Sequence, residues 1–250
     1  MSQELPNFLD PAAFTTRLQA AARTAGFRIE TFGVAAEFPL CALTKRSSGI
    51  RPRIYLSAGI HGDEPAAPLA LLTLLDRGLF DQRAVWFVCP LLNPIGFVRR
   101  TRENADGVDL NRDYKALRSH EIQAHSRWLR RQPNFDLAVC VHEDWEAKGY
   151  YLYEVNATRQ PGLATRMISA AAKVCPIETA SIIDGREVSE PGIIRPNSDP
   201  ALREDWPESI YLKAHHTQLG YTIESPSALP LEQRVAAHVA ALETAIAAVT

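Results

Sequence analysis

One stretch joins an apolar run to an apolar helix through a short polar turn. Residues 54–60 have the composition of a buried strand, and residues 66–75 (Ala-Ala-Pro-Leu-Ala-Leu-Leu-Thr-Leu-Leu) have that of a buried helix. The turn between them carries His61 and Glu64, three residues apart. A strand followed at once by a helix is the building unit of α/β sheets, which bind ligands at the carboxyl ends of their strands. The stretch therefore predicts an α/β fold with polar groups at one sheet edge.

The alternation of strand-like and helix-like segments continues along the chain. Apolar runs predict further strands over residues 27–34, 40–45, 85–92, 135–141, 150–155 and 219–224. Helical spacing predicts helices over residues 10–26, 67–79, 119–129, 162–174 and 231–249. Between them we expect a turn at residues 93–96, a long polar loop at residues 97–113 and an irregular excursion over residues 180–210. Without a repeat or a long linker, the pattern predicts one α/β domain over residues 1–250, with a largely parallel sheet.

Composition excludes several classes of protein. The net charge of -2 gives no overall basic character for binding nucleic acid. No stretch of about 20 apolar residues predicts a membrane span. The four cysteines form no C-x-x-C pair and imply no disulfide framework. Because the first residues also lack the basic start and apolar core of a signal peptide, we expect a cytoplasmic protein.

A second histidine, His142, directly follows the apolar run of residues 135–141. If its strand is a parallel neighbour of residues 54–60, then His61, Glu64 and His142 meet at one sheet edge. Imidazole nitrogen and carboxylate oxygen are zinc ligands, and three protein ligands leave a fourth position for water, as in catalytic sites. Each residue alone has a structural alternative, since Glu64 could cap a helix N-terminus and His142 could be a hydrogen-bonded strand end. Together they predict a single bound zinc ion.

Polar residues of the long loop and of the last predicted strand could belong to the same site. Arg102 precedes the turn of the polar loop, and Asn111 and Arg112 end it. A guanidinium beside an amide suits a carboxylate, because its donors form a fixed fork. Asp109 is expected to hold its own loop by accepting backbone N–H groups. Glu224 ends a strand, where it could take a proton from water at the metal or be an ordinary exposed glutamate.

The motifs, taken in order, resemble those of zinc carboxypeptidases and of their relatives, the succinylglutamate desuccinylase and aspartoacylase group. The resemblance covers about residues 54–227 and rests on His61-Gly-Asp-Glu64, Asn93-Pro-Ile-Gly96, Gly107-Val-Asp-Leu-Asn-Arg112, His142 and Thr222-Ile-Glu224. It implies a three-layer α/β sandwich with a mixed, largely parallel central sheet flanked by helices. It also implies one Zn²⁺ ion held by His61, Glu64 and His142.

The resemblance further implies roles for the remaining residues. Glu224 would be the general base and acid, and Arg102 would polarise the scissile carbonyl. Asn111 and Arg112 would grip a substrate carboxylate. Tyr211 lies in the general region of the family's mobile active-site tyrosine, although its neighbours match no motif.

These expectations together predict a zinc hydrolase that cleaves an amide bond next to a free carboxylate. A small intracellular carboxypeptidase acting on a short peptide is the first interpretation, and a deacylase acting on an N-acyl amino acid is the second. A catalytically silent module that binds carboxylates would lack a ligand or the base, and neither is missing. A serine hydrolase is disfavoured, because the chain has no G-x-S-x-G motif.

Overall fold

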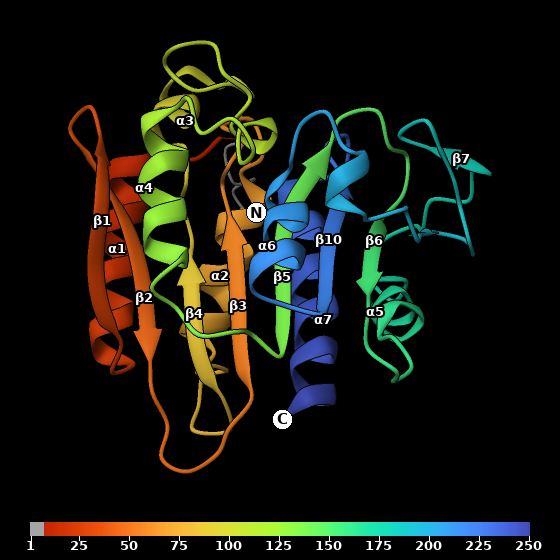
Figure 1. The fold of residues 1–250 in the computed structure, drawn as a ribbon, viewed down its shortest axis with the longest axis horizontal. Helices are drawn as coiled ribbons and strands as arrows, with labels where there is room; N and C mark the ends of the chain where they lie inside the picture. The colour runs from red at the N-terminus through yellow and green to blue at the C-terminus, as the bar shows by residue number, and fades with distance from the viewer. Residues whose placement is uncertain (1–7) are drawn as a thin grey trace, which may run out of the picture.

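The computed structural model describes residues 8–250, which are built around one eight-stranded sheet (Figure 1). Across the sheet the strands follow the order β1-β2-β4-β3-β5-β10-β6-β9. A separate small hairpin pairs β7 with β8. The strand bounds are β1 Arg28–Ala35, β2 Phe38–Lys45, β3 Arg53–Ala58, β4 Val85–Cys89, β5 Leu137–Asp144, β6 Tyr151–Asn156, β7 Ile182–Ile183, β8 Arg186–Glu187, β9 Ile193–Ile194 and β10 Leu219–Pro226.

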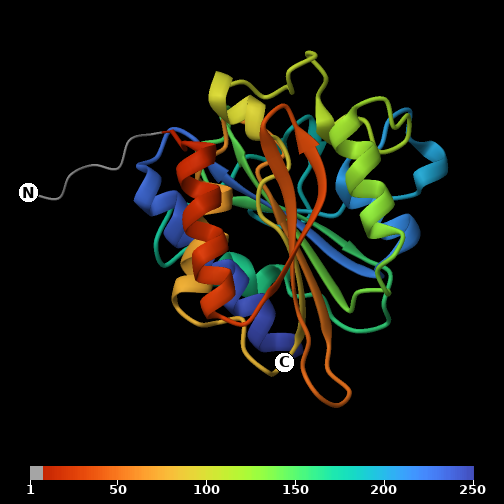
Figure 2. The same ribbon diagram turned by 90° about the vertical axis from the view of Figure 1, so that its left-hand side faces the viewer.

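Helices cover both faces of the sheet, which Figure 2 shows between two helical layers. One layer holds α1, α2, α5 and α7, and the other holds α4 and α6. The short helix α3 lies beyond the end of the sheet (Figure 1). The helix bounds are α1 Pro11–Thr24, α2 Ala66–Asp76, α3 Pro94–Arg99, α4 His120–Leu129, α5 Ala164–Ala171, α6 Glu208–His215 and α7 Leu231–Val249, with 3-10 turns η1 at Leu110–Arg112 and η2 at Pro200–Leu202.

The centre of the sheet is parallel, the strands beside it are antiparallel, and the edge pair β6–β9 is parallel again. Strand β3 pairs in parallel with β4 and with β5, and β5 pairs in parallel with β10. The pairs β1–β2, β2–β4 and β10–β6 are antiparallel. The predicted three-layer α/β sandwich with a mixed, largely parallel sheet is therefore confirmed. Among the described residues, no helix has both the length and the apolar character needed to span a bilayer.

The predicted turn at residues 93–96 is wrong, because these residues begin helix α3. Asn93 is the N-cap, and its Oδ1 accepts a hydrogen bond from the Gly96 backbone at 2.9 Å. Pro94 occupies the first helical position, where a missing N–H costs little. The same residue types favour turns and helix starts, so composition alone did not separate the two.

Two further boundaries differ from the sequence prediction. Strand β5 does not stop before His142, because its pairing with β10 continues to Asp144 opposite Pro226. Residues 180–210 are irregular only in part, since they contain the hairpin β7–β8, the short strand β9, η2 and the start of α6. Helix α6 follows Pro207, has an acidic residue in its first turn and basic residues in its last turn. These are start and stop signals of a helix, although the segment is short and its apolar stripe is weak.

Candidate active site

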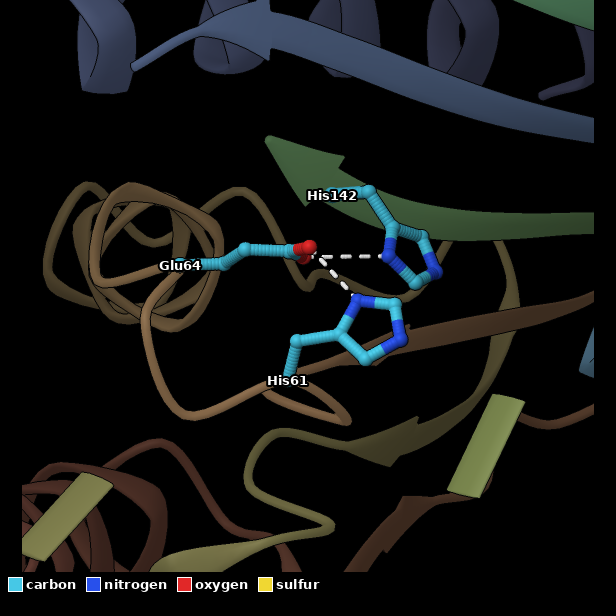
Figure 3. Close-up of side chains that lie close together, drawn as sticks. All are labelled: His61, Glu64 and His142. Carbon is cyan, nitrogen blue, oxygen red and sulfur yellow. Dashed lines mark hydrogen bonds and ion pairs between the residues drawn. The ribbon is translucent and has the colours of Figure 1, made fainter. Parts of the chain in front are cut away.

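Three predicted metal ligands lie together at the carboxyl ends of β3 and β5 (Figure 3). The Nδ1 atoms of His61 and His142 approach the two oxygens of Glu64, at 2.5 Å from Oε1 and 3.0 Å from Oε2, respectively. The ligand atoms of the three residues lie within 4.8 Å of one another, and all three side chains are buried. Two imidazole nitrogens and one carboxylate oxygen fit the preferences of zinc, so this donor set could hold the ion.

The charges around this cluster are strongly coupled. Burial opposes ionisation of Glu64, yet the two imidazoles of His61 and His142 lower its pKa well below the usual range. Burial also lowers the pKa of His61, but the carboxylates of Glu64 and Asp109 outweigh it and raise this pKa. The Glu64 carboxylate therefore lies between the two imidazole rings. A divalent cation bound here would supply the positive charge that stabilises this carboxylate.

Asp109 does more than the turn-making predicted from sequence. Its Oδ1 accepts the Asn111 backbone N–H at 2.8 Å, as expected, and lies 3.3 Å from His61 Nε2. Its Oδ2 accepts from Arg102 Nε at 3.0 Å. A carboxylate on the second ring nitrogen fixes the tautomer and orientation of a metal-ligating histidine. No motif signalled this contact, because Asp109 and His61 are far apart in the sequence.

Arg102 reaches the cluster through the same carboxylate. Its Nη1 lies 3.2 Å from His61 Nδ1 and 3.7 Å from Glu64 Oε1. The guanidinium is thus held by Asp109 on one side and faces the ligand cluster on the other. A cation at this position can donate hydrogen bonds to an oxygen that becomes negative beside the metal.

Glu224 lies next to His142 because β10 and β5 are parallel and Glu224 pairs with His142 in register. Burial raises the pKa of Glu224 well above its ordinary value, while His142 works in the opposite direction. Glu143 is on the other face of the sheet, as strand alternation predicts. There its carboxylate accepts the Ala66 backbone N–H at 2.5 Å and pairs with Arg234 of α7.

The cluster opens into a cavity of about 340 Å³. Its lining includes the three candidate metal ligands, Glu224, Arg102, Asn111 and Arg112, so the structure brings together these sequence-predicted residues. Arg112 donates to the Asn111 carbonyl at 2.9 Å, and its Nε lies 3.9 Å from Asp205, at the limit of an ion pair. Its guanidinium therefore retains donors that a ligand could use.

Tyr211 does not belong to this cavity, so the sequence prediction for it is not supported by its position. Its ring packs against Tyr114 and His215, with ring centres 5.4 Å and 4.7 Å away. Its side chain is buried in the layer formed by α4 and α6. Two other tyrosines, Tyr151 and Tyr153 of β6, line the cavity instead. In the β6–β10 pairing, Tyr151 lies opposite Glu224 and Tyr153 lies opposite Thr222, so both tyrosines share a face of the sheet with Glu224. This relation is visible only once β6 is known to pair with β10.

Sequence reasoning also missed two arginines of the cavity wall, Arg186 of β8 and Arg203 after η2. Among the described residues, no carboxylate lies within ion-pair distance of either side chain. Burial lowers the pKa of Arg203, and the nearby positive charges of Arg186 and Arg112 lower it further. Chain segments that are distant in the sequence thus place three guanidinium groups along one side of the cavity.

Comparison with known proteins shows which proteins this chain is similar to. Residues 50–171 match the model of the succinylglutamate desuccinylase/aspartoacylase catalytic domain. Carboxypeptidase SOL1 of Arabidopsis thaliana is 30% identical over 112 residues, which are 36% of this chain and 23% of the plant protein. The match thus spans about a quarter of the length of that relative.

Solved structures extend the likeness to almost the whole chain. A candidate metallopeptidase of Shewanella amazonensis superposes with a TM-score of 0.84 and 26% identity, covering 96% of this chain and 94% of the other. A metallo-carboxypeptidase of Burkholderia cenocepacia has a TM-score of 0.69 and 18% identity over 93% of this chain and 67% of the other, a likeness of fold alone. The chain is thus similar to the succinylglutamate desuccinylase/aspartoacylase catalytic domain over residues 50–171 and to a solved metallopeptidase structure over almost its whole length.

Proposed function

We propose that residues 1–250 form a single catalytic domain that hydrolyses an amide bond next to a free carboxylate. The observation that carries this proposal is the shared cavity: a His-Glu-His donor set, a carboxylate in register beside it, and arginines along one wall. The similarity to the succinylglutamate desuccinylase/aspartoacylase catalytic domain and to a solved metallopeptidase structure supports a metallohydrolase in general terms. A carboxypeptidase acting on a short peptide is the preferred form of this activity.

In this proposal His61, Glu64 and His142 hold one zinc ion. When bound, zinc supplies a Lewis acid that polarises a carbonyl and lowers the pKa of water to about 7. Glu224 accepts the proton of the attacking water and passes it to the leaving amine. Arg102 donates hydrogen bonds to the carbonyl oxygen as this oxygen becomes negative.

Asn111 and Arg112 bind the carboxylate of the substrate and thereby fix which amide bond meets Glu224. Arg186 and Arg203 support the choice of an anionic substrate, because both guanidinium groups line the cavity near Arg112 and have no carboxylate within ion-pair distance among the described residues. An amide or ester of the same substrate lacks the negative charge and should bind less well.

Substrate profiling tests the proposal. Zinc-loaded protein is incubated with N-blocked dipeptides that carry a free C-terminus, with their C-terminal amides and with N-acetyl amino acids. We expect hydrolysis of free acids and little hydrolysis of the matched amides. Equal turnover of free acids and amides, or no hydrolysis of any free acid by protein with one zinc ion per chain, would contradict the proposal.

The second candidate is a deacylase that acts on N-acyl amino acids. It is favoured by the match of residues 50–171 to the succinylglutamate desuccinylase/aspartoacylase catalytic domain. The same panel separates the two, because a deacylase should prefer N-acetyl amino acids to blocked dipeptides. We also propose a cytoplasmic location, which rests on the sequence alone.

A further inference from the structure

Asn111 is oriented by a partner outside the cavity. Its Oδ1 accepts a hydrogen bond from the backbone N–H of Glu208 at 2.9 Å. Because a backbone N–H can only donate, the atom facing it must be the amide oxygen. The amide nitrogen of Asn111 has no hydrogen-bond partner in the described part of the chain, and Asn111 lines the cavity. Asn111 is therefore set to donate to a ligand and not to accept from one.

Glu208 is the first residue of α6, and its side chain anchors this helix end to β3. The carboxylate accepts from the Tyr55 hydroxyl at 2.6 Å and from the Ser57 hydroxyl at 2.8 Å. The carboxylate is almost completely buried, so its hydrogen bonds are hard to replace by water. Tyr55 and Ser57 lie on the strand that leads into the turn carrying His61.

The anchor continues through a chain of buried hydrogen bonds. The Tyr55 hydroxyl has one proton, which it donates to Glu208, so it accepts from His125 Nε2 at 3.0 Å. His125 Nδ1 must then accept from the Tyr114 hydroxyl at 2.7 Å. Tyr114 lies three residues after Asn111, so this series of hydrogen bonds ties both ends of the segment 111–114 to the core. Networks in which every member is satisfied hold a single geometry.

We infer that Glu208 is a positioning residue for substrate recognition: its buried carboxylate holds the start of α6 so that Asn111 presents only N–H donors to the substrate carboxylate. The inference rests on the proposed role of Asn111 and Arg112. Asn111 and Arg112 then offer only hydrogen-bond donors, which suit a carboxylate because both of its oxygens accept hydrogen bonds. It leaves the NH₂ group of a primary amide without an acceptor, which penalises that substrate.

The test compares Glu208→Gln with Glu154→Gln, both as zinc-loaded protein. Glu154 is a matched control, because it is a buried carboxylate that accepts a tyrosine hydroxyl, from Tyr221 at 2.8 Å, but contacts α5 and Arg195 instead of Asn111. The probes are an N-blocked dipeptide free acid, its C-terminal amide and the released free amino acid.

For Glu208→Gln we expect the KM of the free acid to rise about ten- to hundredfold, the scale of one hydrogen bond to a charged group. The kcat should stay within about threefold, because the interaction binds substrate and transition state alike. Binding of the free amino acid, measured by calorimetry, should weaken by the same factor as the KM rises. The amide should be affected much less, the zinc content should stay at the wild-type level, and Glu154→Gln should behave as the wild type.

Several results would overturn the inference. Loss of zinc from Glu208→Gln, or equal losses for the free acid and the amide, would make Glu208 a general structural residue. If Glu208→Gln does not fold, Ser57→Ala removes one hydroxyl that holds the carboxylate and should give a smaller, equally selective rise in KM. Asn111→Ala separates this inference from the proposed function. A selective effect in Asn111→Ala alone refutes only the positioning role, whereas no selective effect in Asn111→Ala refutes the proposed carboxylate site.

Discussion

The buried pair of Glu143 and Arg234 leads to a sharp prediction about stability. The two side chains are 0% and 1% exposed, respectively, and they join β5 to α7 directly behind His142. Glu143 also accepts the Ala66 backbone N–H, and Arg234 Nε donates to the Leu229 carbonyl at 2.9 Å. Replacing Glu143 by Gln removes the carboxylate that pairs with this buried guanidinium, which cannot lose its proton. Breaking such a pair costs about 3–5 kcal/mol of unfolding free energy.

Replacing Arg234 by Met should lower the unfolding free energy less than replacing Glu143 by Gln does. Burial raises the pKa of Glu143 above its ordinary value, and the Arg234 guanidinium works against this rise. In Arg234→Met, Glu143 can therefore take a proton and become neutral near pH 7. The double variant Glu143→Gln/Arg234→Met removes both charges of the pair, so it should recover most of the loss in unfolding free energy seen in Glu143→Gln.

Urea unfolding at pH 7.5 measures these free energies, and turnover per zinc-bound molecule is measured well below the unfolding midpoint. Glu146→Gln is the control, because this exposed carboxylate lies nearby and should change the unfolding free energy by less than about 0.5 kcal/mol. Turnover of folded Glu143→Gln should remain within a few-fold of the wild type. A Glu143→Gln protein of normal stability that has lost turnover would make Glu143 the catalytic base and refute the reasoning.

Three further predictions concern the metal, the carboxylate site and acid stability. His61→Ala should lose zinc and activity, because one of three ligands is gone; full zinc content by elemental analysis with intact activity would contradict the assignment. Arg112→Lys keeps the charge but removes the planar fork, so kcat/KM should fall strongly for free acids and much less for amides, and equal losses would make Arg112 structural. Burial lowers the pKa of His125 to about 3, so between about pH 6.5 and 3 the unfolded chain binds a proton that the folded chain excludes. The unfolding free energy should therefore fall by about 2 kcal/mol from this group as the pH decreases from 7 to 5. In zinc-free protein with a chelator present, the unfolding free energy of His125→Gln should fall by about 2 kcal/mol less than that of the wild type over the same pH range. An equal fall in both proteins would refute the contribution of His125.

Much of the fold could be predicted from local patterns, because buried parallel strands are apolar throughout and helices have their own spacing. Strand β3, helix α2 and helix α7 are of this kind. Helix α3 was not predicted, because Asn93 and Pro94 serve turns and helix starts equally well. Helix α6 was not predicted either, because its eight residues show weak periodicity.

Some residues of the candidate site could likewise be predicted from local patterns, and others could not. His61, Glu64, His142 and Glu224 end strands or begin a turn, so their position in the sequence indicates the edge of the sheet. Arg186 reaches the cavity through a two-residue strand, and no local pattern indicates that direction. The packing of Tyr211 away from the cavity also depends on tertiary contacts, namely those with Tyr114 and His215.

The central claim is that a zinc ion held by His61, Glu64 and His142 acts with Glu224 as the base. The most direct measurement is the zinc content and the turnover of Glu224→Gln, determined on the same preparation and on a free-acid substrate that the wild type hydrolyses. Glutamine keeps the shape of the side chain and removes its basicity. We predict one zinc ion per chain, as in the wild type, and a loss of roughly 10²–10⁴-fold in turnover. Near-normal turnover with zinc retained would contradict the account.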